Sequence, residues 1–256
     1  MKDSSRDIAL CLDLGGVSQR AAEEFVRLAQ EATSSSGRFT VALSGGSTPK
    51  ALYTLLSSET FQARVPWTKV HLFWGDERCV PPDHADSNYR MVRETLLDRA
   101  PIPKENIHRM LGEDTDPSRA AAKYEETLRE TFSLGPGQLP RFNLVLLGMG
   151  DDGHTASLFP HTTALSETKS LVVANYVEKF GTYRLTVTVP VINHAAQVVF
   201  LISGGAKAVV LKEVLEGKED SQRLPSQLIR PATGKVLYIV DHAAGRELAP
   251  VQRDDP

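Results

Sequence analysis

Short apolar runs alternate along this chain with stretches whose apolar residues recur at helical spacing. Strands that alternate with helices in this way usually pair in parallel and are covered by those helices. The order therefore predicts an α/β protein with a mostly parallel sheet. The expected strands are residues 8–12, 39–43, 70–74, 142–147, 171–174, 183–189, 198–202 and 236–240. The expected helices are one capped by Ser18 and those over 49–56, 88–98, 117–132, 206–215 and 243–248.

Composition limits the partners of such a protein. The 256 residues are 41% apolar and 24% charged, with a formal net charge of −3. This length suffices for one domain, over residues 1–256, with a substantial core. A slightly negative chain has no overall attraction for nucleic acid or anionic membranes, so an anionic ligand depends on local groups. Residues 1–7 are polar and no apolar run is long enough to span a bilayer, so we expect a cytoplasmic protein.

No pattern of residues indicates a metal or a cofactor. Cys11 and Cys79 lie far apart and match neither zinc nor CxxC spacing, which favours two reduced thiols. No histidine pair or acidic cluster has the spacing of a metal loop, and a Walker A lysine is missing. The sequence predicts an enzyme that uses neither a metal nor a cofactor.

Polar loops follow four of the expected strands, and ligands of parallel sheets bind at the carboxyl ends of strands. In the first loop, two glycines allow a close approach of the backbone to a ligand. Ser47 or Thr48 is expected to cap the helix that Pro49 begins, and free N–H groups there suit a phosphate. An ordinary strand-to-helix turn remains the alternative. The loop consists of Ser44, Gly45, Gly46, Ser47, Thr48 and Pro49.

The second loop follows residues 70–74 and contains Asp76, Glu77 and Arg78. The planar guanidinium of Arg78 can hold a carboxylate or phosphate through two hydrogen bonds. Either acidic residue can instead pair with Arg78 and fix its position. A surface salt bridge without function is the alternative.

The third loop follows residues 142–147 and includes Asp152 and His154 among glycines. Its GxGxxG pattern resembles a dinucleotide fingerprint, but Asp151 and Asp152 would place two negative charges where a pyrophosphate must lie. We interpret the loop as a wall that presents Asp152 and His154 to a cavity. Histidine is the usual general base near neutral pH, and a neighbouring carboxylate can orient its ring.

The fourth loop, after residues 198–202, pairs Gly204 and Gly205 with Lys207 at a helix start. Lys207 can reach a bound phosphate or can be a solvated helix residue. Arg184, near the start of the strand over 183–189, is a second candidate for binding phosphate. Arginines on strands often lie on the solvent-exposed face of a sheet. The position of Arg184 alone therefore does not indicate that it binds phosphate.

Together, residues 43–49, 74–81, 148–160, 183–186 and 205–208 resemble the 6-phosphogluconolactonase family. That family is related to glucosamine-6-phosphate deaminases and isomerases, in which tyrosine typically stands in the place of Arg78. Asp151 departs from the lactonase pattern, where proline or another residue is common. The resemblance implies a single-domain, Rossmann-like, mostly parallel sheet with helices on both faces. It also implies hydrolysis of 6-phosphoglucono-1,5-lactone to 6-phosphogluconate, the second step of the oxidative pentose phosphate pathway.

A lactone is an activated ester, so water needs only a base and some stabilisation of charge. The expected catalytic residues are His154 as general base, Asp152 and Arg78. Either Arg78 or loop N–H groups can stabilise the oxyanion. The candidate residues for binding the substrate and its phosphate are Ser44, Gly45, Gly46, Ser47, Thr48, Asp76, Glu77, Arg184 and Lys207.

Two other functions remain open at this point. One is an isomerase or deaminase of amino-sugar phosphates, in which Asp76 would move a proton at C2. The other is a sugar-phosphate sensor without activity, which predicts binding but no turnover. A monomer or a small homo-oligomer is expected in each case.

Overall fold

The central element of the fold is a seven-stranded sheet, which confirms the predicted α/β class. The computed structural model describes residues 6–249. The strand order is β1-β10-β9-β6-β2-β3-β5, and each neighbouring pair is parallel. The strands are β1 (Arg6–Cys11), β2 (Phe39–Leu43), β3 (Val70–Trp74), β5 (Ile107–His108), β6 (Leu144–Leu147), β9 (Gln197–Ile202) and β10 (Lys235–Asp241).

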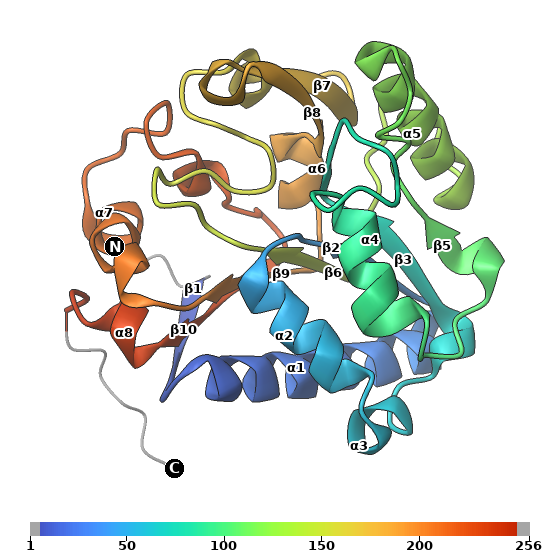
Figure 1. Cartoon of the computed structure of the whole chain (residues 1–256), viewed down its shortest axis with the longest axis horizontal. Helices are drawn as coiled ribbons and strands as arrows, with labels where there is room; N and C mark the ends of the chain where they lie inside the picture. Colours follow the sequence, from blue (N-terminus) through green and yellow to red (C-terminus); the bar gives the residue numbers. More distant parts are fainter. Residues whose placement is uncertain (1–5, 250–256) are drawn as a thin grey trace.

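Helices flank this sheet. The longest, α1, runs along one side of it, and α2 packs against α1 (Figure 1). A π-helical turn, Arg93–Leu97, continues α4. The helices are α1 (Leu14–Ser36), α2 (Ser47–Leu56), α3 (Glu59–Gln62), α4 (Asn88–Val92), α5 (Pro117–Thr131), α6 (Val189–Asn193), α7 (Ala208–Glu216) and α8 (His242–Gly245). No helix among the described residues is long and apolar enough to cross a membrane.

The start of α1 differs from the prediction that Ser18 caps it. Asp13 is the N-cap, and its Oδ1 accepts a hydrogen bond of 2.9 Å from the Gly16 N–H. Ser18 lies inside the helix and donates to the carbonyl of Leu14. The helix begins earlier because Val17 adds another turn to the buried face. The helix ends at Ser36, where the C-cap Gly37 adopts the left-handed conformation (φ 78°).

A second, antiparallel sheet lies on the side of the central sheet opposite α1 (Figure 1). Its order is β4-β8-β7, with β4 (Asp76–Arg78), β7 (Val172–Val177) and β8 (Thr182–Val187). Two of the expected strands therefore lie outside the parallel sheet. The reason is the short connection between β7 and β8, since parallel neighbours require a crossover of a dozen or more residues.

The middle of the central sheet is the core of the protein. Every residue of β2, β6 and β9 is buried. Phe200 on β9 stacks on Tyr238 of β10, with ring centroids 4.6 Å apart.

The four strands that precede the predicted polar loops, β9, β6, β2 and β3, are adjacent. Their parallel direction places all four loops at one edge of the sheet. The expectation of a cytoplasmic protein rests partly on residues 1–7, and most of these lie outside the described part of the chain.

Candidate active site

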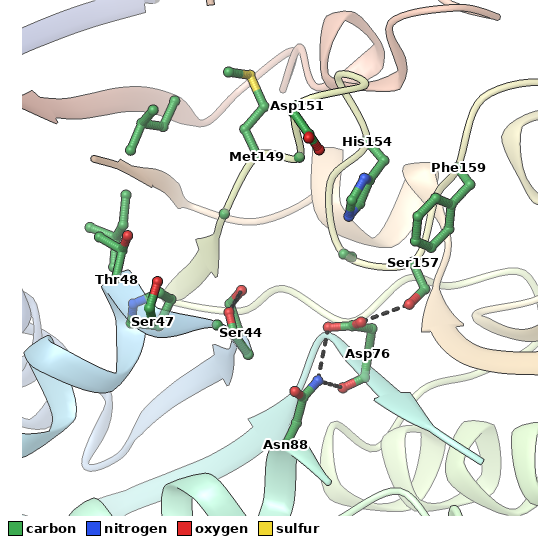
Figure 2. A pocket seen from close by; sticks show the side chains of 18 of the residues that line it. Ser44, Ser47, Thr48, Asp76, Asn88, Met149, Asp151, His154, Ser157 and Phe159 are labelled. Carbon is green, nitrogen blue, oxygen red and sulfur yellow. Dashed lines mark hydrogen bonds between the residues drawn. The ribbon is translucent and has the colours of Figure 1, made fainter. Parts of the chain in front are cut away.

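A pocket of about 340 Å³ lies at the carboxyl edge of β9, β6, β2 and β3. All four predicted loops line it, and the small sheet contributes Arg78 and Arg184. In Figure 2 the ring of His154 and the carboxylate of Asp76 face the same space, with Ser44 and Ser47 across from them. The lining includes all predicted binding residues except Glu77: Ser44, Gly45, Gly46, Ser47, Thr48, Asp76, Arg184 and Lys207.

The loop after β2 leads into α2 without a side-chain cap. Gly46 is the N-cap, with φ 105°, and makes no side-chain bond, so the expectation that Ser47 or Thr48 caps this helix is wrong. The N–H groups of Ser47 and Thr48 belong to the first helical turn and have no intrahelical acceptor. They are therefore available to an anion in the pocket.

Two contacts fix this loop in place. The hydroxyl of Tyr53 accepts from the Ser44 N–H (3.0 Å) and donates to the Ser44 carbonyl (2.8 Å). A Cβ at Gly45 would lie 1.9 Å from Oδ1 of Asn88, so only glycine fits there. The backbone of the loop is thus tied to α2 through Tyr53 and packs closely against Asn88 at the start of α4.

His154 and Asp152 form a close pair in the loop after β6. Nδ1 of His154 contacts Oδ1 of Asp152, which also accepts from the His154 backbone N–H at 3.3 Å. A carboxylate can only accept, so Nδ1 carries a proton and Nε2 is left as an acceptor. His154 lines the pocket, whereas Asp152 does not and lies behind the ring. The expectation that both face the cavity is thus correct for His154 alone.

Asp152 is held as a carboxylate. Burial raises its pKa, but the hydrogen bond and charge of His154 and the bond from Lys179 lower it more. The pKa of Asp152 therefore lies well below its usual range. A permanently ionised partner fixes the tautomer of His154 and favours the imidazolium that forms when it accepts a proton.

Glycines make room for this pair. A Cβ on Gly150 would lie 2.1 Å from Nδ1 of His154 and 2.6 Å from Oδ1 of Asp152. Gly153 adopts φ 76°, and its carbonyl accepts from the N–H and hydroxyl of Ser226, each at 2.9 Å. Ser226 thus anchors the loop at Gly153, where the positive φ disfavours any residue with a side chain.

Phe159 supports the ring of His154 on one face. The two rings stack with centroids 4.1 Å apart and an interplanar angle of 26°. Phe180, from the turn between β7 and β8, packs against Phe159 in a T-shaped arrangement with ring centroids 5.6 Å apart. Both phenylalanines line the pocket, so they shield His154 from part of the solvent.

Asp76 is a buried carboxylate that faces the pocket. Its Oδ2 accepts from the hydroxyl of Ser157 at 2.7 Å, and Asn88 Nδ2 donates to its carbonyl at 2.9 Å (Figure 2). A weaker contact of 3.4 Å joins Asn88 Nδ2 to Oδ1. This oxygen has acceptor capacity left, which suits a sugar hydroxyl.

Glu77 does not belong to the pocket, contrary to the prediction that it contacts substrate. Its carboxylate accepts from the backbone N–H groups of Arg78 (2.7 Å), Asn88 (2.8 Å) and Tyr89 (2.8 Å). Burial raises the pKa of Glu77, and these bonds offset part of that effect. The alternation of side chains along β4 turns Glu77 away from its neighbours, and the residue anchors the start of α4.

Arg78 and Arg184 lie opposite one another on β4 and β8. Burial, and then the charge of Arg78, lowers the pKa of Arg184. In residues 6–249 neither guanidinium forms an ion pair with a carboxylate, although Arg78 donates to the carbonyl of Asp86. Two unneutralised cations side by side in a pocket wall favour the binding of an anion. Arg184 therefore lies in the pocket and not on the wet face of its strand.

Lys207 ends a short 3₁₀ turn, Gly205–Lys207, that precedes α7. It lines the pocket together with Ser203. The Ser203 hydroxyl and the Gly204 N–H bind Asp241, which orders this loop. The positive groups of the pocket thus come from separate walls, Lys207 from the main sheet and the two arginines from the small one.

Four contributing residues had no role assigned from the sequence. Ser157 and Asn88 hold Asp76, and Lys179 and Phe180 approach His154 and Asp152 from the β7–β8 turn. Ser157 lies inside the third motif, which is a signal that could have found it. Lys179 and Phe180 have no comparable signal, because only the antiparallel pairing of β7 and β8 brings them to the pocket.

In the described part of the chain, no group of three or more histidine, cysteine or acidic residues is arranged to hold a metal ion. Arg78, Arg184 and Lys207, on separate walls of the pocket, can supply positive charge to an anionic ligand without a metal. We expect dialysis against EDTA to leave the activity unchanged. Loss of turnover on dialysis, followed by recovery on adding a divalent ion, would contradict this expectation.

Comparison with known proteins places this geometry in context. The sequence profile of glucosamine-6-phosphate isomerases/6-phosphogluconolactonase matches residues 13–238. The 6-phosphogluconolactonase of Nostoc sp. is 48% identical over 213 residues, which cover 83% of this chain and 86% of the relative. That of Synechocystis sp. is 46% identical over 214 residues, covering 84% and 86%.

A solved structure is also similar. The 6-phosphogluconolactonase from Trypanosoma cruzi superimposes with a TM-score of 0.84 at 30% sequence identity. The match covers 96% of this chain and 97% of that protein. The likeness therefore extends over both the parallel sheet and the small antiparallel sheet.

Proposed function

The chain belongs to the family of glucosamine-6-phosphate isomerases and 6-phosphogluconolactonases, and within it we propose that it hydrolyses 6-phosphoglucono-1,5-lactone to 6-phosphogluconate. This is the lactonase step of the oxidative pentose phosphate pathway. The observation that carries the mechanism is the placement of His154. Its Nδ1 is engaged by Asp152, and the ring lines a pocket that has positive groups on its other walls.

His154 acts as a general base on water. Nε2 accepts a proton from the water that attacks C1 of the lactone, and the new C–O bond makes a tetrahedral oxyanion. When the C1–ring oxygen bond breaks, the imidazolium returns the proton to the departing oxygen. Asp152 stabilises the imidazolium between these two steps and does not itself take the proton. A general base of this kind contributes about 10²–10⁴-fold to the rate.

Arg78 stabilises the oxyanion, because its guanidinium lies in the pocket and its position is fixed by the carbonyl of Asp86. Asp76 receives a hydroxyl of the sugar ring. The N–H groups of Ser47 and Thr48, with Arg184 and Lys207, bind the phosphate. Binding a group remote from C1 orients the ring and so contributes to kcat as well as to affinity.

Arg184→Ala and Lys207→Ala are each expected to weaken binding of the phosphorylated lactone. A charge-assisted contact contributes on the order of 1.5–3 kcal/mol, so KM should rise by roughly 10-fold to 10²-fold. The measurement compares each variant on 6-phosphogluconolactone and on unphosphorylated gluconolactone. An equal loss on both substrates would show that the residue does not recognise phosphate.

Two assays separate the proposed function from its alternatives. Lactone hydrolysis, corrected for spontaneous opening, should be fast, and release of ammonia from glucosamine 6-phosphate should be undetectable. Ammonia release with slow lactone hydrolysis would instead assign a deaminase in which Asp76 moves a proton. Tight binding of 6-phosphogluconate without either activity would assign a sensor.

The remaining aspects of the function are proposals that follow from composition. The protein acts as one domain in the cytoplasm, on a free small molecule, without nucleic acid, membrane or cofactor. The net charge of −3 supports the lack of nucleic-acid and membrane partners, because it provides no general attraction for polyanions. The protein is a monomer or a small homo-oligomer, and the mechanism above requires residues of one chain only.

A further inference from the structure

The turn between β7 and β8 reaches the catalytic pair from outside the four loops of the main sheet. It consists of residues 178–181, with the 3₁₀ turn Glu178–Phe180 followed by Gly181 in the left-handed conformation (φ 60°). Nζ of Lys179 donates to Oδ2 of Asp152 at 3.3 Å. This contact joins the small sheet directly to the group that orients His154.

The contact occupies the one carboxylate oxygen that His154 leaves open. Oδ1 of Asp152 is used by the ring and backbone N–H of His154, and Oδ2 is used by Lys179. A carboxylate held at both oxygens cannot rotate about its terminal bond without breaking a contact. Lys179 therefore restricts the orientation of the carboxylate that contacts the imidazole.

The same turn also reaches one face of the ring through Phe159. Phe180 contacts Phe159, which stacks on His154, and the Arg184 guanidinium lies 5.3 Å from the centroid of Phe180. The turn thus contacts both neighbours of the ring, Asp152 by charge and Phe159 by packing. Lys179 itself does not line the pocket.

We propose that Lys179 is a positioning residue for lactone hydrolysis, which acts by holding Asp152 and through it the base His154. The proposal rests on the proposed role of His154. A residue that only orients the base should change kcat and leave KM nearly unaltered, because substrate binding does not involve it. Small displacements of a base cost rate steeply, so we expect a loss of about 3- to 10-fold in kcat for Lys179→Met.

A general loss of stability is not expected from this change. The Lys179 side chain is 59% exposed, and the turn is held by Phe180 and by the buried Val177. Lys123→Met is a matched control. Lys123 pairs with Asp114 at 3.2 Å, is 50% exposed and lies outside the pocket, so its replacement should leave kcat at the wild-type value.

The decisive test is a double-mutant cycle with Asp152→Asn. If Lys179 acts through Asp152, Lys179→Met lowers kcat in the wild-type background and has no further effect in Asp152→Asn. Lys179→Arg, which keeps the charge, should restore most of the rate. An equal loss in both backgrounds, or no loss in either, would overturn the proposal.

His154→Ala separates failure of this proposal from failure of the mechanism. If His154→Ala abolishes turnover while Lys179→Met is as active as wild type, only the role of Lys179 is wrong. If His154→Ala keeps near-wild-type turnover, the base is another residue and the mechanism itself is wrong.

Discussion

His154→Ala should lower kcat by at least about 10²-fold, with a much smaller change in KM. The variant keeps the pocket walls but has no group that can accept the proton of the attacking water. His154→Gln should lose as much, because an amide does not act as a base. The measurement is initial-rate kinetics on 6-phosphogluconolactone, with spontaneous hydrolysis subtracted at every pH.

The wild-type rate should also fall toward acid pH, since a protonated imidazole cannot accept a proton. Asp152 does not contribute to that fall, because its pKa is held well below the usual range and it stays ionised.

Asp152→Asn should lower kcat less than His154→Ala if the carboxylate only orients the ring. His242→Ala is a matched control, because His242 is exposed at the start of α8, outside the pocket. A folded His154→Ala enzyme with near-wild-type kcat would refute this assignment.

Gly150→Ala should reduce kcat by about 10²-fold without altering a single reactive group. The added methyl would lie 2.1 Å from Nδ1 of His154, so the ring must turn away from Asp152 and from its place in the pocket. A displacement of about 1 Å at a catalytic group can cost this much. The backbone itself tolerates alanine, since Gly150 is not among the glycines with positive φ.

The check on Gly150→Ala combines kcat with the melting temperature. Tm should stay close to that of the wild type, which separates displacement of the base from unfolding. Gly135→Ala is the control, because a Cβ there meets only ordinary contact with Gln138 at 3.4 Å, in a loop away from the pocket. If Gly150→Ala retained kcat, the close packing around His154 would not matter for catalysis.

The parallel sheet was predictable because its signals are local. The runs 39–43 and 70–74 match β2 and β3 in both bounds, since each is mostly apolar and ends at a polar loop. β4 was not predicted, because a strand of three charged residues has no apolar pattern. The separate sheet was missed for a related reason. Pairing of β4 with β8 joins residues far apart in the sequence, and no local sequence pattern predicts it.

In the candidate site, too, the sequence predicted the residues that have a local signal and missed distinctions that depend on the fold. The sequence placed His154, Arg78 and the glycine loop at the pocket, because glycines and charges after a buried strand form a local pattern. It did not separate Asp76, which faces the pocket, from Glu77, which anchors α4, since both acids are consecutive. Their roles depend on the pleat of β4, which turns adjacent side chains in opposite directions.

The order of strands in the central sheet also determines when the enzyme becomes active. β9, β6, β2 and β3 are neighbours in space, but the residues that they bring to the pocket extend from Ser44 to Lys207. Such distant pairings form late in folding, because the entropy of closing long loops must be overcome first. The anion-binding residues lie on both sides of His154 in the sequence, Ser47 and Arg78 before it and Arg184 and Lys207 after it, so no short segment contains the whole pocket. Catalysis is therefore a property of the completed sheet, and partly folded chains have none of it.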